Sequence, residues 1–149
     1  MSKAESADLI MKLYDLRREE KMREARVWMA GFFPESAGEI MNAMIDPASS
    51  ANFRMVTSYW DMAASFVNHG AIDEDMFRDT SGEHMIVFSK IEPHLEEFRA
   101  LLGNPNYLKN LEALVMRLPD AKELLKARRE MIKRFIEASK QAEAAKAAI

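Results

Sequence analysis

Residues 51–69 read ANFRMVTSYWDMAASFVNH, and this stretch decides the fold. Its apolar residues recur every three or four positions, which is the spacing of a helix, and they form two neighbouring stripes. The first stripe contains Phe53, Val56, Trp60, Ala63 and Val67, and the second contains Met55, Tyr59, Met62 and Phe66. A helix with so wide an apolar surface is buried on most of its circumference. We therefore expect an apolar helix over 51–69 at the centre of an all-α fold.

The first helix of the chain is expected to be long, and a shorter helix over 35–45 follows it. Ser2 and Glu5 form a capping-box pattern, which marks the start of a helix. The first helix-breaking residues that follow are Gly31 and Pro34. The sequence therefore predicts one continuous helix over 3–33.

The second half of the chain holds further helix signals. Thr80 and Glu83 repeat the capping-box pattern and open a helix. Pro93 lies inside that helix and removes one backbone hydrogen bond, so we expect a kink or a split there. Asn104 supplies an N-cap for the next helix, and Pro119 opens a long last helix that continues to the C-terminus.

Together these signals predict an all-α fold, an irregular bundle of about five or six helices with long first and last members. A length of 149 residues fits one domain, so the whole chain, 1–149, is expected to be a single helical domain. Its alanine-rich end, 142–149, has little apolar surface to bury, and we expect it to fray.

The composition excludes several classes of protein. The chain has no cysteine, so neither a disulfide framework nor thiolate chemistry is available. A net charge of −3 gives no general attraction to nucleic acid. No apolar run approaches the roughly 20 residues of a membrane-spanning helix, and the first segment of the chain is too charged for a signal peptide. We therefore expect a cytoplasmic protein without a membrane span.

The middle of the chain resembles a known group of proteins. The residues that carry the resemblance are Tyr59-Trp60, Gly70-Ala71-Ile72-Asp73, Phe77, Pro93, Arg99 and Gly103-Asn104-Pro105. Over roughly residues 50–118 the chain is similar to an uncharacterised family of small bacterial all-helical proteins, a domain of unknown function. The resemblance implies a helical fold and a bacterial source. It implies no reaction, cofactor or catalytic residue.

No motif for catalysis or metal binding stands out in the sequence. Histidines and carboxylates gather between residues 69 and 84, but no Glu stands three residues before a His, which is the spacing that di-metal helical bundles use. This pattern is typical of a solvated connection with capping carboxylates. The sequence also lacks a nucleophile elbow and a Gly-rich phosphate loop. We therefore expect no metal, no cofactor and no catalytic residue, and the balance favours a protein that is not an enzyme.

One charge pattern on the last helix exceeds the background. Four cations follow at helical spacing and share one face, and they are Lys122, Lys126, Arg129 and Lys133. Such a face suits phosphate backbones or an acidic protein surface. The segment 73–83 carries five carboxylates and one arginine, so it offers an acidic counterpart in the same chain or in a second copy. A solvated helix face is the plainest interpretation.

Three functions are open at this point. The leading one is a non-enzymatic interaction module that forms a homo-oligomer, a dimer, through its long terminal helices, because Val27 and Trp28 extend the apolar surface of the first helix over more than one face. The second is a nucleic-acid-associated or regulatory protein that uses the basic face, which the lack of a helix-turn-helix signature disfavours. The third is a small-ligand binder or enzyme with a pocket near Trp60 and Asp61, which the lack of a convergent acid–base set disfavours.

Overall fold

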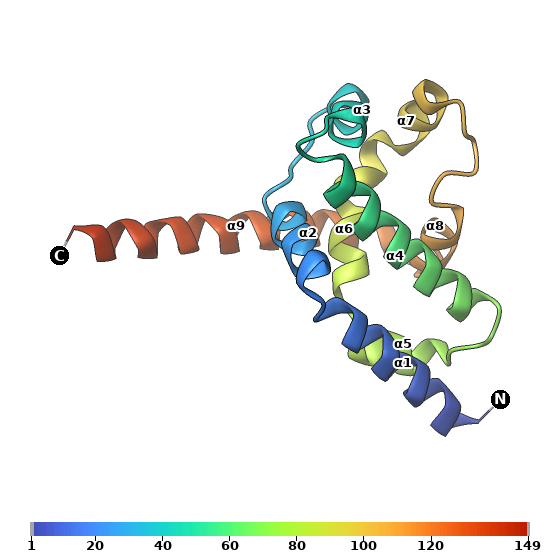
Figure 1. Cartoon of the computed structure of the whole chain (residues 1–149). Helices are drawn as coiled ribbons and strands as arrows, with labels where there is room; N and C mark the ends of the chain where they lie inside the picture. The colour runs from blue at the N-terminus through green and yellow to red at the C-terminus, as the bar shows by residue number, and fades with distance from the viewer. Residues whose placement is uncertain (1, 149) are drawn as a thin grey trace.

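The computed structural model describes residues 2–148, and these residues form helices joined by short connections (Figure 1). The helices are α1 (Lys3–Arg17), α2 (Glu20–Ala30), α3 (Ala37–Ile45), α4 (Ser50–Asn68), α5 (Glu74–Thr80), α6 (Glu83–Ile91), the 3-10 helix η1 (Glu92–His94), α7 (Leu95–Leu102), α8 (Lys109–Met116) and α9 (Ala121–Ala147). The described part of the chain contains no β-strand. The prediction of an all-α fold is therefore confirmed.

The expected count of five or six helices is too low, because the helix expected over 3–33 is divided into α1 and α2. The capping box of Ser2 and Glu5 opens α1 as predicted. At Glu19 the backbone is extended, and the Glu19 carboxylate accepts a hydrogen bond from the Met22 amide and so begins a new helix. Arg26 donates to the Arg17 carbonyl at the end of α1. These contacts fix a corner that a continuous helix would not allow.

The helix that contains Pro93 is split, as the sequence predicts. It consists of α6, the short 3-10 helix η1 and α7. A proline ring removes a donor and collides with the preceding turn, so an α-helix cannot pass through it undisturbed. The split also adds to the number of helices.

Two predicted helix starts are wrong. Thr80 belongs to the last turn of α5, where its hydroxyl donates to the Met76 carbonyl, and Gly82 precedes α6 without any capping side chain. Asn104 accepts a hydrogen bond from the Asn106 amide, which makes a local turn, and α8 begins only at Lys109. In both places a side chain with capping chemistry bonds to a turn or to its own helix instead.

The helix predicted over 51–69 is observed as α4, but its predicted central position is not confirmed. The first apolar stripe, from Phe53 to Val67, is buried. In the second stripe Tyr59 is buried, whereas Met55, Met62 and Phe66 are exposed. One side of α4 packs against α2 and α8, and its other side forms part of the surface.

The most enclosed helix is α6. It lies between α4 and α9 in Figure 1, and it packs against α8 and α9. All of its residues except Glu83 and Ile86 are buried, including His84 and Lys90. The sequence EHMIVFSKI therefore holds the middle of the bundle although it contains several polar residues.

The last helix, α9, is long, and half of it leaves the bundle. Its first turns pack through Ala121 and Leu125, which are buried. Figure 1 shows the rest of the helix projecting to one side, and every residue from 137 to 148 is exposed. We call residues 134–147 the projecting part of α9. The expected fraying of 142–149 stays a prediction, and Ile149 lies outside the described residues.

Candidate functional site

The four cations of the predicted basic face lie along α9 where it crosses α6 and η1. The structure divides them between two hollows on either side of Arg129. The first, the Phe33 hollow, has a volume of about 510 Å³, and Lys133 lines it together with Phe33, Lys90 and Lys140. The second, the Glu96 hollow, has a volume of about 830 Å³ and holds Lys122 and Lys126.

In the Glu96 hollow the cations face carboxylates of the same chain. The wall opposite Lys122 and Lys126 carries acidic residues of η1, α7 and α8, and they are Glu92, Glu96 and Glu112. Arg129 donates to the Ser89 carbonyl at 2.7 Å and lies 3.9 Å from the Glu92 carboxylate. Arg99 also lines this hollow and pairs with Glu112 at 3.0 Å, so carboxylates and cations of one chain are mixed along this part of the basic face.

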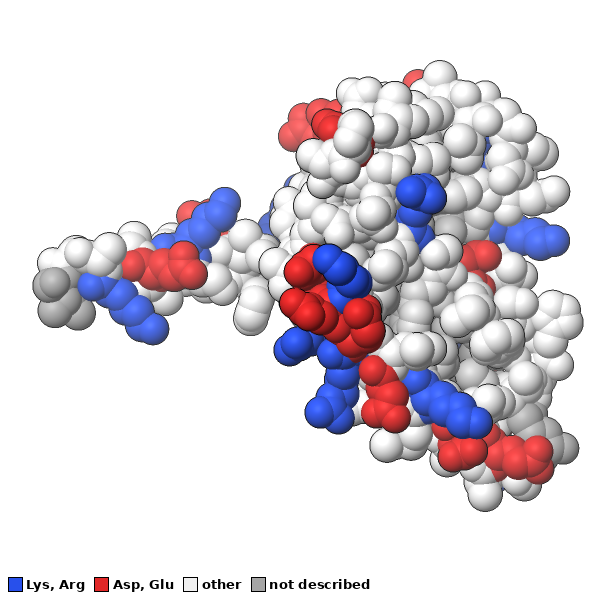
Figure 2. All heavy atoms as spheres, in the orientation of Figure 1, with Lys and Arg blue, Asp and Glu red and all other residues white. Residues whose placement is uncertain are grey.

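The acidic segment 73–83, which the sequence offered as the counterpart of the basic face, is paired elsewhere. Asp73 forms an ion pair with Lys3, and Glu83 forms one with Arg26 at 3.0 Å. The hydrogen bond from Lys3 contributes most to lowering the pKa of Asp73, and the bond from the Met76 amide adds to it. Figure 2 shows charges of both signs side by side over the corner of α1 and α2, while few charges lie over α4.

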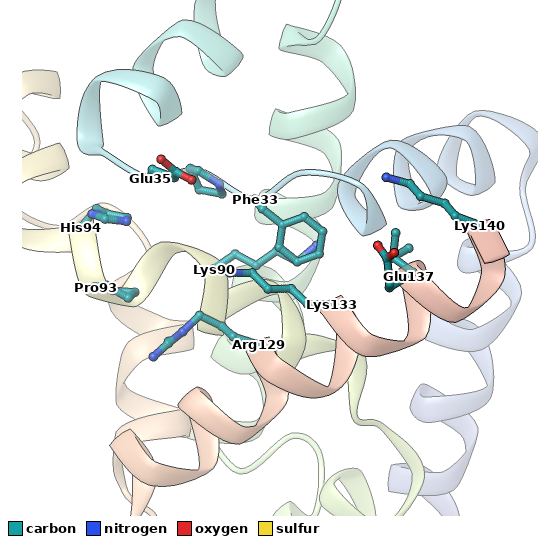
Figure 3. Close-up of a pocket in the computed structure, with 11 residues that line it drawn as sticks. Phe33, Glu35, Lys90, Pro93, His94, Arg129, Lys133, Glu137 and Lys140 are labelled. Atoms are coloured by element: carbon teal, nitrogen blue, oxygen red, sulfur yellow. The ribbon is translucent and has the colours of Figure 1, made fainter.

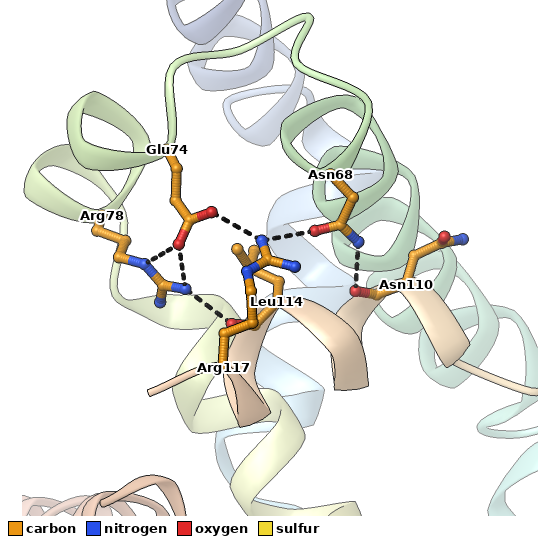
Figure 4. Close-up of polar contacts among 6 residues, drawn as sticks. All are labelled: Asn68, Glu74, Arg78, Asn110, Leu114 and Arg117. Atoms are coloured by element: carbon orange, nitrogen blue, oxygen red, sulfur yellow. Dashed lines mark hydrogen bonds and ion pairs between the residues drawn. The ribbon is translucent and has the colours of Figure 1, made fainter. Parts of the chain in front are cut away.

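Glu74 of the same segment is the centre of a network that ties α5 to α8 (Figure 4). Arg78 donates to its carboxylate at 2.8 and 3.0 Å and also to the Leu114 carbonyl at 2.7 Å. Arg117 donates to the other oxygen of Glu74 and to Asn68, both at 2.8 Å. Burial opposes ionisation of Glu74, but the hydrogen bonds from the two arginines outweigh it and lower the pKa of Glu74. These carboxylates hold helices together, so the segment is not merely a solvated connection.

Lys90 is the residue of the Phe33 hollow that sequence reasoning missed. Its side chain is 2% exposed, and its ammonium donates to the carbonyls of Met29 and Ala30 at the end of α2. The same nitrogen lies 4.5 Å from the centroid of the Phe33 ring, a cation–π distance. Burial lowers the pKa of Lys90 to about 8. No spacing in the sequence separates this lysine from a solvated one.

The structure does not bring Trp60 and Asp61 into one pocket. Trp60 is 1% exposed, and its indole nitrogen donates to Glu83 at 3.1 Å. Asp61 points to α8, where its carboxylate accepts hydrogen bonds from the Leu111 amide at 3.0 Å and from the Asn110 side chain at 3.2 Å. Asp61 thus supplies the capping group that α8 does not obtain from its own preceding residue.

His84 is a second polar residue that sequence reasoning missed. It is 1% exposed and lies between the rings of Trp60 and Phe77. Neither ring nitrogen has a hydrogen-bond partner among the described residues. Burial lowers the pKa of His84 to about 4, so the ring is neutral at pH 7. Its position at the start of α6 gave no sign of this burial.

Among residues 2–148, no group of three or more His, Asp or Glu side chains is placed to hold a metal ion. Within the same residues, no helix combines the length and the apolar character needed to cross a membrane. The arrangement that stands out chemically is the Phe33 hollow, where lysines from α6 and α9 converge on one aromatic ring.

Comparison with known proteins gives one match. Residues 3–118 match the profile of a family described as "Domain of unknown function (DUF4760)". The match is wider than the region 50–118 on which the resemblance was noticed, and it ends before α9. No curated protein and no solved structure matches the chain.

Proposed function

The chain belongs to the family described as a domain of unknown function (DUF4760), and from that premise we propose that it is a non-enzymatic interaction module that self-associates through α9. The projecting part of α9 carries this proposal. Every residue from 137 to 148 is exposed, and Phe135 at the base of the projection is 64% exposed. A helix of this length without packing is only marginally stable in water, since isolated helices below about 12–15 residues are marginal. A partner helix would supply the missing packing.

The seam on the projecting part suits a second helix that approaches closely. Apolar and small residues recur at spacings of three and four from Ile132, just before the projecting part, and they continue with Phe135, Ser139 and Ala142. Ala138 and Ala145 flank this seam, while most charged side chains lie on the other side of the helix. Small residues at and beside a seam allow two helix backbones to come together along its length.

A second copy of this chain is the occupant that we propose for the seam. Because most charged side chains of the projecting part lie away from the seam, a second copy can pack on the seam without burying many of them. A twofold dimer is also the commonest assembly for a soluble protein. The module would then be a homodimer of bacterial cytoplasmic proteins, as the sequence suggested.

The first helix contributes less to the proposed interface than the sequence indicated. Trp28, one of its exposed candidates, is partly buried, stacks on Phe32 at 4.7 Å and contacts Phe53 edge-on. Val27 is 75% exposed and is the residue of that apolar set still available to a partner. The proposed interface therefore rests on α9 alone.

Sedimentation equilibrium of the full chain over a wide concentration range tests the proposal. The wild type should have the mass of a dimer, and the double variant Phe135→Glu with Ala142→Glu should have the mass of a monomer, because both changes place a charge in the seam. Val27→Glu is the matched control, since it adds a charge at an exposed apolar residue outside α9, and it should remain dimeric. A wild type that stays monomeric at high micromolar concentration would rule the proposal out.

The two other functions predicted from the sequence receive weaker support. The cations Lys122 and Lys126 face carboxylates, which reduces their attraction for a nucleic-acid backbone. Trp60 is enclosed, and Asp61 lines a separate hollow but already accepts two hydrogen bonds from α8, which weakens the case for a shared pocket. We therefore propose no enzymatic role.

A further inference from the structure

We propose that the Phe33 hollow is a binding site for a small phosphate-type oligoanion, such as a compound that carries a diphosphate group. The proposal concerns the junction between α6, α9 and the connection that follows α2, and it does not depend on the self-association of α9. The hollow is lined by cations from two helices, and most of them are not neutralised by the rest of the chain.

The first step of the argument is the free charge in the hollow. Lys133 and Lys140 make no hydrogen bond or ion pair with any residue of the described chain, 2–148. Lys90 bonds to two neutral carbonyls and forms no ion pair with a described residue, although the Glu83 carboxylate acts on its charge from a distance. Figure 3 shows Lys90 and Lys133 beside the Phe33 ring, Arg129 on one side and Lys140 on the other. An anion in this space would meet cations from several directions.

The second step is the way in which these cations are held. The Lys90 ammonium lies 4.5 Å and the Lys133 ammonium 5.7 Å from the centroid of Phe33, so one aromatic ring attracts two ammonium groups of the hollow. Backbone carbonyls fix Lys90, and the Ser89 carbonyl fixes Arg129 at 2.7 Å. Cations that are already held in place lose less side-chain freedom when they bind an anion. Burial also leaves the pKa of Lys90 at about 8, and a bound anion would raise it.

The third step is the size and class of the ligand. A volume of about 510 Å³ lies within the range of small-molecule sites. Glu35 and Glu137 also line the hollow, and Figure 3 places them on opposite walls. A long phosphate backbone that crosses the hollow would run against these carboxylates. A compact oligoanion can instead contact the lysines alone, and the multiple acceptor oxygens of a phosphate group suit several ammonium donors.

Titration calorimetry of the full chain with sodium pyrophosphate, at pH 7 and constant ionic strength, tests this site. We expect saturable binding of one pyrophosphate per chain. The double variant Lys133→Gln with Lys140→Gln should weaken binding by about tenfold or more, because two charge-assisted contacts are lost. The matched control, Lys122→Gln with Lys126→Gln, removes the same charge from the same helix outside the hollow and should change the affinity by less than about twofold.

A second measurement distinguishes a specific binding site from non-specific attraction by positive charge. The pKa of Lys90, followed by NMR of its side chain, should rise from about 8 when pyrophosphate saturates the protein. No binding up to millimolar pyrophosphate, or equal losses in the two double variants, would overturn the proposal. A short RNA duplex could also displace the bound pyrophosphate at a concentration of RNA phosphate below that of pyrophosphate. That result would overturn the proposal and assign the basic face of α9 to nucleic acid. The Phe135→Glu, Ala142→Glu variant should bind pyrophosphate as the wild type does, whatever its oligomeric state.

Discussion

The burial of helices α4 and α6 is the reverse of what their sequences suggest. The sequence of α4 contains two apolar stripes, which predicts burial on most sides, yet Met55, Met62 and Phe66 are exposed. α6 contains His84, Ser89 and Lys90, yet all three are buried. The difference shows that enclosure depends on what surrounds a helix. A buried polar group is tolerated where a carbonyl receives it, as for Lys90, or where it becomes neutral, as for His84.

The largest effect is expected on the inner stripe of α4. Trp60→Ala should lower the free energy of unfolding by about 3–5 kcal/mol, because it leaves a cavity among packed rings and removes the hydrogen bond from the indole to Glu83. Urea unfolding at pH 7 measures this loss. A loss below about 1 kcal/mol would show that Trp60 packs loosely, and the contrast between the two faces of α4 would then disappear.

The next effect concerns the buried lysine of α6 and depends on pH. The folded pKa of Lys90 is about 8, below the ordinary value of 10.5, so the unfolded chain binds more protons between these values. The wild type should therefore gain stability relative to Lys90→Met as the pH rises from 8 to 10.5, on the order of 3 kcal/mol in total. Urea unfolding of both proteins across this range gives the difference directly. A difference that does not change with pH would mean that Lys90 keeps an ordinary pKa.

A smaller effect is expected at the other buried polar residue of α6. His84→Phe should raise the free energy of unfolding at pH 7 by about 1 kcal/mol, because it removes two polar atoms without partners from an aromatic site. The pKa of His84 is lowered from 6.5 to about 4, so the wild type loses stability as the pH falls between these values. The gap between variant and wild type should therefore widen from pH 7 to pH 5 in thermal melts. A gap that narrows would contradict a neutral His84.

The smallest effect is expected on the outer face of α4. Met62→Lys should change the free energy of unfolding by less than about 0.5 kcal/mol, because Met62 is 39% exposed and has room to direct a charge to water. Urea unfolding of Met62→Lys and of Trp60→Ala under the same conditions compares the free energies of unfolding for the outer and the inner face of α4. A loss of several kcal/mol would indicate that this face is covered in solution, for example by a second chain.

The parts of the fold that could be predicted from the sequence depend on neighbouring residues. Ser2 and Glu5 form their capping box within one turn, and Pro93 acts on its own helix. The parts that could not be predicted depend on residues far away in the chain. The acidic segment 73–83 reaches Lys3 and Arg117. The corner at Glu19 is an exception, because its contacts with Met22 and Arg26 are local and compete with a continuous helix.

The candidate site shows the same limit. The spacing along α9 singled out Arg129 and Lys133, because helical periodicity alone places them on one face. The other half of the Phe33 hollow comes from Lys90 and Phe33, which belong to different elements and meet α9 only in the folded chain. Periodicity within one helix holds no information about which lysine of another helix lies opposite.

The cap that α4 gives to α8 has a consequence for the order of folding. α8 is short, it follows Leu108 with a left-handed backbone, and the amide of Leu111 in its first turn donates to Asp61 of α4. A helix of eight residues with a borrowed cap has little tendency to form by itself. We therefore expect α8 to form only after α4 is in place, so that the amide protons of both helices exchange with solvent in one cooperative opening event.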